Sequence, residues 1–273
     1  MLINGQTSDT VRADDRGLAY GDGLFETLRV CTGQILLLQE HLQRLQHGAG
    51  VLGIPCNLAL IRQWLDEACR TAPAECVLKL VLTRGSGGRG YRPPADAQST
   101  CIISQHALPE LSRAKAEQGV AAFLCQQRLA AQPVLAGIKH LNRLEQVLAS
   151  REFVGKSCFE GLMADYRDLL IEGTRSNVFV SLAGQWLTPC LSHSGVHGVL
   201  RRRLLDSLGT SLQQADIPLQ DLHKADELFV ANSVFGVVPI AGLQLGDKTL
   251  AFRPGPFTAA AQDCFEQVLA SCS

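Results

Sequence analysis

Lysine is rare in this chain, and one lysine stands where its amine could do chemistry. Only six lysines occur among the 273 residues, and Lys139 lies in the segment 136–143, just before a stretch with helical spacing. A lysine that is partly removed from water can be neutral at pH 7 and can form a Schiff base with an aldehyde. Lys79 is the alternative, because it alternates with Val77 and Val81 on one strand face, where its stem could pack while its amine reaches solvent.

Other groups would suit an aldehyde cofactor that carries a phosphate. Glu172 precedes a polar turn, and Arg44 is a cation on a largely apolar helical face. Gly198 and Val199 open an expected helix, whose first backbone N–H groups can bind a phosphate. Two residues with hydrogen-bonding side chains end an apolar strand: Asn232 and Ser233. Each residue alone has a structural explanation, but together they meet the needs of such a cofactor.

A glycine-rich string at 85–90 matches the pattern GxGxxG and follows an expected strand. A dinucleotide-binding fold needs a helix to open at the third glycine, and Pro93 and Pro94 argue against one. The glycines indicate a mobile or closely approached loop, with an ordinary solvated hairpin as the alternative. The loop carries three cations that could contact the carboxylates of a substrate: Arg84, Arg89 and Arg92.

The overall composition excludes several classes of protein. Hydrophobic residues make up 46% of the chain and charged residues 19%, which is enough apolar material for a packed core and too much for a disordered chain. The net charge of −1 offers no general attraction to nucleic acid or to an anionic membrane. We therefore expect a small-molecule substrate held by cations in a local pocket.

Ten cysteines are scattered along the chain without a CxxC pair. This spacing argues against a zinc site and favours free thiols in a reducing compartment. The N-terminal residues lack the basic and apolar regions of a secretory signal, and the apolar runs are too short to span a bilayer. We expect a cytoplasmic protein with no bound metal.

The elements that must position these residues alternate irregularly between strand and helix. Strands are expected at 25–30, 34–38, 76–84, 100–106, 120–125, 161–165, 169–171, 177–181 and 227–232. Helices are expected at 39–52, 58–71, 141–154, 199–208 and 257–270. The order predicts an α+β fold rather than a strict βαβ winding.

The polar stretch 109–118 is the expected linker between two domains. The first would be an N-terminal α+β domain over 1–108. The second would be a C-terminal α+β domain over 119–273 that carries the candidate lysine.

These residues carry a family likeness: the chain resembles the fold-type IV pyridoxal-phosphate enzymes, which include branched-chain and D-amino-acid aminotransferases. The resemblance runs over nearly the whole chain. Its markers are Asp15–Gly17, Gly21–Phe25, His41–Leu45, Arg84–Tyr91, Gly137–Val147, Glu172–Phe179 and Gly198–Arg201. The 84–91 and 139–147 strings are similar to those of the lyases of this family.

The resemblance implies a role for each candidate residue toward pyridoxal 5′-phosphate. Lys139 would form the Schiff base and Glu172 would face the pyridine nitrogen. Arg44 would bind the phosphate. Further contacts to the cofactor are expected from Asn177, Gly198, Val199, Asn232 and Ser233. Contacts to the substrate from Arg84, Arg89, Tyr91 and Arg92 are our own extension of the resemblance.

The resemblance also implies a two-domain fold with the cofactor in the interdomain cleft, and a homodimer whose partner contributes to the active-site rim. The implied activity is a lyase of folate biosynthesis that converts 4-amino-4-deoxychorismate to p-aminobenzoate and pyruvate. An aminotransferase acting on D- or branched-chain amino acids is the nearest alternative. A cofactor-free binding protein with the same fold is a more distant one.

Overall fold

The computed structural model describes residues 1–111 and 113–272, which form two compact units. The first unit contains Met1–Leu108, the short segment Ile138–Asn142 and the C-terminal residues from Leu269. The second unit contains Pro109–Gly137 and Arg143–Val268.

These units differ from the continuous domains 1–108 and 119–273 expected from the sequence, because the first unit also contains Ile138–Asn142 and the C-terminal residues from Leu269. The segment that carries Lys139 belongs to the first unit, because the Phe25 N–H donates to the Lys139 carbonyl at 3.0 Å and the Leu141 N–H donates to the Gly23 carbonyl at 2.9 Å. Within the expected linker 109–118, helix α4 (Arg113–Gln118) is part of the second unit, and residue 112 lies outside the described residues, as does residue 273.

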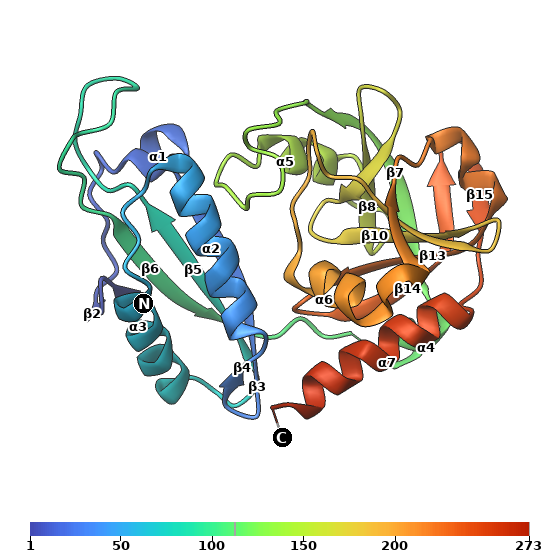
Figure 1. Ribbon diagram of the computed structural model, residues 1–273, viewed down its shortest axis with the longest axis horizontal. Coiled ribbons are helices and arrows are strands. Elements are labelled where there is room, and N and C mark those ends of the chain that lie inside the picture. The colour runs from blue at the N-terminus through green and yellow to red at the C-terminus, as the bar shows by residue number, and fades with distance from the viewer. Residues whose placement is uncertain (112, 273) are drawn as a thin grey trace. The chain divides into compact units, whose positions relative to one another are not determined.

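The first unit is built on an antiparallel sheet with helices packed against it (Figure 1). The strand order is β2-β1-β6-β5-β3-β4. The strands are β1 (Leu2–Ile3), β2 (Gln6–Thr7), β3 (Gly23–Cys31), β4 (Gln34–Ile35), β5 (Cys76–Thr83) and β6 (Thr100–His106). The helices are α1 (Arg16–Tyr20), α2 (Leu38–Leu52) and α3 (Leu58–Thr71).

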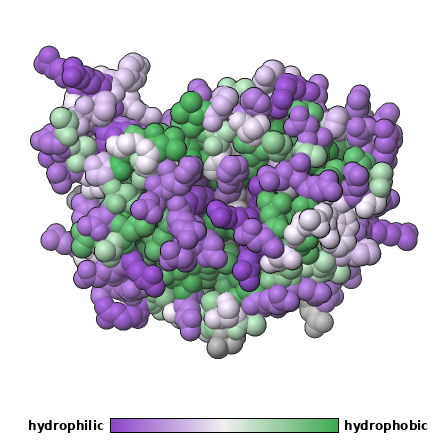
Figure 2. All heavy atoms as spheres, in the orientation of Figure 1, coloured by the Kyte–Doolittle hydropathy of each residue, from purple (hydrophilic) through white to green (hydrophobic). Residues whose placement is uncertain are grey.

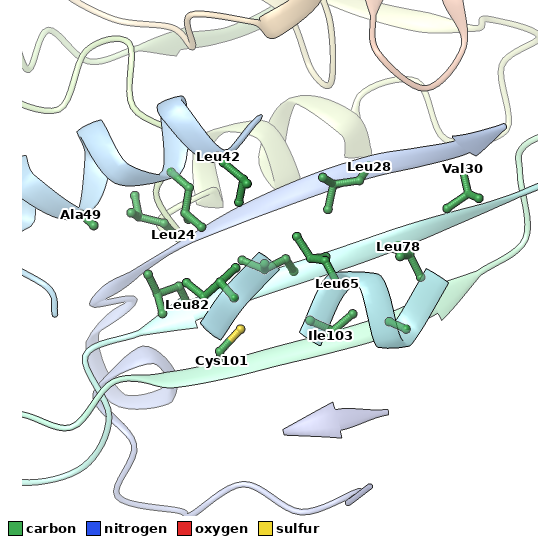
Figure 3. Close-up of a cluster of buried hydrophobic side chains, with 14 of the residues drawn as sticks. Leu24, Leu28, Val30, Leu42, Ala49, Leu65, Leu78, Leu82, Cys101 and Ile103 are labelled. Atoms are coloured by element: carbon green, nitrogen blue, oxygen red, sulfur yellow. The ribbon is translucent and has the colours of Figure 1, made fainter. Parts of the chain in front are cut away.

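Alternation along the strands decides which face of this sheet is buried. Leu24, Leu28 and Val30 of β3 point to the same side and are at most 1% exposed, as strand geometry requires for alternate residues. Figure 3 shows these side chains meeting apolar residues of α2 and α3, among them Leu42 and Leu65. The two helices therefore cover one face of the sheet.

The second unit is built on a nine-stranded sheet. Its main path runs in the order β12-β11-β10-β13-β14-β7-β8-β9, with β15 paired to β14. The strands are β7 (Val120–Leu129), β8 (Glu160–Asp165), β9 (Leu170–Gly173), β10 (Asn177–Leu182), β11 (Gln185–Pro189), β12 (Leu212–Ala215), β13 (Ala225–Asn232), β14 (Gly236–Leu245) and β15 (Lys248–Ala251). Its longer helices are α5 (Leu144–Arg151), α6 (Val199–Leu208) and α7 (Pro256–Ala270), and 3₁₀ turns lie at Gly209–Ser211 and Leu219–Lys224.

One pairing in the second unit joins the end strand β9 back to β10, the third strand of the main path. Strand β9 also pairs with β10, through Glu172 opposite Asn177. This pair closes the strands from β10 to β9 into a ring. Glu172 and Asn177, two residues singled out from the sequence, therefore lie at the seam of the closed sheet.

Several of the expected elements have the bounds that the sequence predicts. The expected α+β class is confirmed, because both units combine sheet with helices. The helix at 58–71, the strand at 100–106 and the helix at 199–208 match residue for residue. The strand expected at 34–38 is wrong beyond Ile35, since α2 begins at Leu38. The helix expected at 141–154 is shorter, as α5 spans Leu144–Arg151.

Strand β14 was not expected, although it pairs with β13, β7 and β15. Pro239 lies inside it, and proline usually argues against a central strand because it cannot donate to the ladder. The buried residues Val237, Val238 and Ile240 around it show that burial outweighs this preference.

The cysteines of the chain are free thiols. Within the described residues, no helix is long and apolar enough to cross a membrane. Figure 2 shows hydrophilic residues spread over the visible face, with hydrophobic residues among them.

Leu65→Ala should destabilise the first unit strongly, because Leu65 is fully buried between α3 and the sheet. Removing a buried leucine side chain lowers the free energy of unfolding by about 2–5 kcal/mol. Leu60→Ala on the same helix is the matched control, since Leu60 is 42% exposed. Urea denaturation measures both, and equal losses would contradict the packing described above.

Candidate active site

Lys139 lies beside an aromatic ring in the first unit. Its ammonium nitrogen is 4.3 Å from the centre of the Phe25 ring, and its side chain is half-buried. The rival lysine, Lys79, reaches the same ring at 5.9 Å but is exposed. An aromatic face holds an ammonium by cation–π attraction and shields it from water on one side. The surroundings of Lys139 thus suit a partly desolvated amine better than those of Lys79.

Arg44 is held by the buried carboxylate of Glu26, the residue that follows Phe25. Arg44 donates from Nε to Glu26 Oε1 at 2.9 Å and from Nη2 to Glu26 Oε2. His41 Nδ1 lies 2.6 Å from Glu26 Oε2. Glu26 and His41 are 2% and 1% exposed, so this cluster fixes the Arg44 guanidinium from the inside of the unit.

The titration of this cluster follows from its burial and its charges. Burial raises the pKa of Glu26, but the Arg44 charge and the hydrogen bonds from Arg44 and His41 outweigh it and lower the pKa to about 2. Burial lowers the pKa of His41, and the charges of Arg44 and Lys139 lower it further against the opposing effect of Glu26. At neutral pH Glu26 is therefore a carboxylate and His41 a neutral imidazole.

The glycine-rich loop is organised around one buried arginine. Arg16, which is 4% exposed, donates to the carbonyls of Gly87 at 3.4 Å, Gly90 at 3.0 Å and Tyr91 at 3.0 Å. Its Nε donates to Asp22 at 2.9 Å. The loop expected to be mobile or closely approached is thus wrapped around a guanidinium.

Arg84 is expected to contact the substrate, but its side chain is buried. It is 8% exposed and donates to Asp22, and to the Gly53 and Leu52 carbonyls at 2.6 and 2.7 Å. These bonds favour a structural role. The other loop residues expected to contact substrate are exposed: Arg89, Tyr91 and Arg92.

Glu172 is a buried carboxylate in the second unit. Its Oε2 accepts from the Val196 N–H at 2.8 Å and its Oε1 from Gln146 Nε2 at 3.3 Å. Burial lowers the pKa of Arg143, and the charge of Glu172 opposes this shift. The positive charge of Arg143 therefore lies within the electrostatic range of Glu172. Among the described residues, two buried polar atoms have no hydrogen-bond partner: Oε1 of Gln146, whose Nε2 donates to Glu172, and Oγ of Ser194, which precedes Gly195 beside Glu172.

The segment that binds Glu172 runs directly into helix α6. Asn177 donates from Nδ2 to the Val196 carbonyl at 2.9 Å, and Gly198 is the N-cap of α6. A side chain at position 198 would clash with Asn177, because a Cβ there would lie 1.9 Å from its Oδ1. The structure therefore brings together Glu172, Asn177 and the start of α6 at Val199.

Asn232 and Ser233 lie in the turn between β13 and β14. Asn232 Oδ1 accepts from the N–H groups of Val234 and Phe235, both at 2.9 Å, and its Nδ2 donates to the Arg175 carbonyl at 3.1 Å. Ser233 is 7% exposed. Asn232 therefore stabilises this turn.

Sequence analysis missed Glu26 and Glu160, two buried carboxylates that hold candidate residues in place. Glu160 accepts from Thr174 N at 3.1 Å, Thr174 Oγ1 at 2.5 Å and Ser176 Oγ at 2.7 Å, and so fixes the turn between Glu172 and Asn177. The signal for Glu26 was present: it interrupts an apolar alternation on β3, and a carboxylate on a buried face needs a cationic partner.

A family model confirms the relationship expected from the motifs. The model of amino-transferase class IV matches residues 23–243, and the chain belongs to this family. It is 36% identical over 265 residues to an aminodeoxychorismate lyase of Vibrio harveyi, covering 95% of this chain and 97% of that relative. It is 30% identical over 252 residues to a putative branched-chain-amino-acid aminotransferase of Methanocaldococcus jannaschii, covering 88% and 86%.

A solved structure shows the same fold. The crystal structure of 4-amino-4-deoxychorismate lyase from Pseudomonas aeruginosa matches with a TM-score of 0.91 and 42% sequence identity, covering 97% of each chain. The two-domain fold-type IV architecture expected from the motifs is thereby confirmed.

Glu26→Gln should change how the stability of the protein depends on pH. The folded-state pKa of Glu26 lies near 2, below its ordinary value of 4.5, so its stabilising charge is fully present above that value and is lost as the pH falls toward 2. The midpoint of thermal unfolding should fall less steeply for Glu26→Gln than for the wild type between about pH 6 and about pH 3. Asp66→Asn, an exposed substitution on α3, should keep the wild-type slope, and equal slopes for all three proteins would refute the assignment.

Proposed function

We propose that this chain is a pyridoxal-phosphate-dependent lyase that converts 4-amino-4-deoxychorismate to p-aminobenzoate and pyruvate in folate biosynthesis. The observation that carries the proposal is the similarity, along nearly the whole chain, to the aminodeoxychorismate lyases of Vibrio harveyi and Pseudomonas aeruginosa. The aminotransferase relative is less similar and shares less of its length. An aminotransferase activity is therefore the second candidate.

The described residues fit the cofactor. Pyridoxal phosphate, when bound, supplies an aldehyde that links to an amine and a pyridine ring that accepts electrons. The buried carboxylate of Glu172 is suited to accept from a protonated ring nitrogen, and such a partner favours the protonated form. Within the part of the chain that the structure describes, Gln146 Oε1 and Ser194 Oγ are buried without partners, as expected where a ligand completes the hydrogen bonding.

The phosphate would bind to the N–H groups that open α6, with Arg44 as the cation. Val196, which donates to Glu172, precedes Gly198 by two residues, a separation of at most about 7 Å. This spacing suits a group that carries a ring nitrogen at one end and a phosphate at the other. Lys139 and Arg44 belong to the first unit and Glu172 to the second.

The chemistry then rests on the amine of Lys139. This amine would hold the cofactor, and as a free base it could take the proton from the substrate carbon that bears nitrogen. Glu172 would favour a protonated ring nitrogen. Lys139, or water, returns a proton to the departing enolpyruvyl group, which gives pyruvate. Proton transfer by a positioned side chain contributes about 10²–10⁴-fold in rate.

The substrate carries carboxylates, and the loop 85–92 offers exposed groups that could bind them. Arg89 and Arg92 are the proposed cations, with Tyr91 between them packed edge-on against Tyr20 at 5.6 Å. Guanidinium groups bind carboxylates through paired hydrogen bonds. The bonds that occupy Arg84 make it the least suited of the four expected substrate residues.

We further propose a cytoplasmic homodimer. Exposed apolar side chains at helical spacing on α5, Leu144 at 76%, Val147 at 53% and Leu148 at 45%, suit an interface between protein chains. Free thiols suit a reducing compartment. Sedimentation of the purified protein and fractionation of its native cells test the two statements.

The activity is tested by incubating the purified protein, loaded with pyridoxal phosphate, with 4-amino-4-deoxychorismate. We expect p-aminobenzoate and pyruvate in equal amounts. A parallel incubation with D-alanine and 2-oxoglutarate tests for transamination. Transamination without formation of p-aminobenzoate would replace the lyase by the aminotransferase.

Lys139→Ala should abolish both cofactor attachment and turnover. Borohydride reduction of the wild type should leave the cofactor on the peptide that contains Lys139, and the variant should lose this label and more than about 10²-fold of its turnover. Lys79→Ala is the matched control, because Lys79 lies near the same Phe25 ring and should leave label and rate unchanged. A label on Lys79 in the wild type would show that the wrong amine was chosen.

A further inference from the structure

Arg201 is a buried cation whose partners are all uncharged. It is 4% exposed and donates to Thr188 Oγ1 at 3.3 Å, the Pro189 carbonyl at 2.9 Å and Gln214 Oε1 at 2.8 Å. Among the described residues, no carboxylate forms an ion pair with it. Burial lowers its pKa to about 10, so the side chain still carries its charge at neutral pH.

The position of this charge is unfavourable for an isolated helix. Arg201 is the third residue of α6, only about 4.5 Å along the axis from the Gly198 cap. The N-terminal end of a helix carries partial positive charge and prefers acidic side chains. The first turn of α6 has no acidic residue, and the cap residue contributes no side-chain hydrogen bond.

An anion bound at the start of α6 would be attracted both by the charge of Arg201 and by the partial positive charge of the helix N-terminus. We propose that Arg201 is a positioning residue that supplies the buried positive charge by which the N-terminus of α6 selects the phosphorylated form of the cofactor. The inference rests on the proposed function, which puts the cofactor phosphate at Gly198 and Val199. It adds a residue that acts through its charge, while its Nε and Nη2 donate to Thr188, Pro189 and Gln214.

The Arg201 side chain is 4% exposed, so water and salt screen its charge less than they screen an exposed charge on the same helix. Charges that are exposed to water are screened by solvent and salt, whereas buried charges are screened much less. Arg202, the next residue on the helix, is 73% exposed and lies 3.9 Å from Asp206. Arg201 and Arg202 therefore carry the same charge in the same turn, and only the first should influence the phosphate.

Gln214→Glu tests the inference without removing Arg201. Gln214 is exposed and already accepts from Arg201, so a glutamate there would supply the missing counter-charge and keep the hydrogen bond. We expect the midpoint of thermal unfolding of the cofactor-free variant to stay level or rise. Its Kd for pyridoxal phosphate should rise about tenfold, since one nearby charge has been neutralised. Its Kd for pyridoxal, which lacks the phosphate, should stay within about twofold of the wild type.

Arg202→Gln is the control, because it makes the same change in net charge at an exposed site. Its affinities for both compounds should match those of the wild type. Arg201→Met is a second variant and should weaken pyridoxal phosphate selectively. If Arg201→Met fails to fold, the comparison of Gln214→Glu with Arg202→Gln still tests whether the buried charge affects the binding of pyridoxal phosphate.

Two results would overturn the inference. Wild-type affinity of Gln214→Glu for pyridoxal phosphate would show that the charge has no effect, and equal losses for pyridoxal and pyridoxal phosphate would show a purely structural role. Failure of the proposed function is distinguishable from both. If the cofactor site is wrong, the wild type itself binds neither compound at Lys139, and if only the lyase activity is wrong, the wild type binds pyridoxal phosphate but forms no p-aminobenzoate.

Discussion

The hydrogen bond from the Val196 N–H to Glu172 Oε2 is the contact on which the candidate site of the second unit depends. It joins the strand pair that closes the sheet to the segment that becomes α6. The Asn177 side chain adds a second bond to the same residue, Val196. A carboxylate and a helix N-terminus are thereby held at a short separation by backbone as well as side-chain bonds. Rigid placement of this kind is what a site needs in order to orient a bound group.

Buried charge recurs in both units. Glu26 is neutralised by Arg44. Glu160 accepts from hydroxyl and backbone donors of a turn and lies 3.8 Å from Nε of the exposed Arg175. Among the described residues, the hydrogen-bond acceptors of Arg201 are uncharged. Burying charge is costly unless it is paired or hydrogen-bonded. Each of these residues supports a segment that the proposed function uses, which accounts for their presence in otherwise apolar surroundings.

Local pattern was sufficient to predict much of the fold. The helix at 58–71 has a clear apolar periodicity and an Asn57 cap, and the α6 helix opens at a glycine. Strand β14 was missed because Pro239 and two glycines oppose local strand propensity, and its burial depends on strands distant in the sequence. Local pattern could not predict that the segment 138–142 belongs to the first unit either, because its place there depends on hydrogen bonds to β3.

The candidate site was predicted in part, for similar physical reasons. Residue type and motif pointed to Lys139, Arg44 and Glu172, because amines, guanidinium groups and carboxylates have few alternatives for the chemistry. The partners that hold them, such as Glu26 and Gln146, become visible only once the chain is folded. Arg84 illustrates the converse: a cation beside a loop can serve the loop's own backbone.

In the loop around Arg16, different groups fix the backbone and face the solvent. Backbone carbonyls of Gly87, Gly90 and Tyr91 fix the course of the loop, while the side chains of Arg89 and Arg92 extend into solvent. Exposed substitutions usually change stability by no more than about 0.5 kcal/mol. Descendants of this chain can therefore acquire a different ligand preference by exchanging those protruding groups, with the supporting frame left intact.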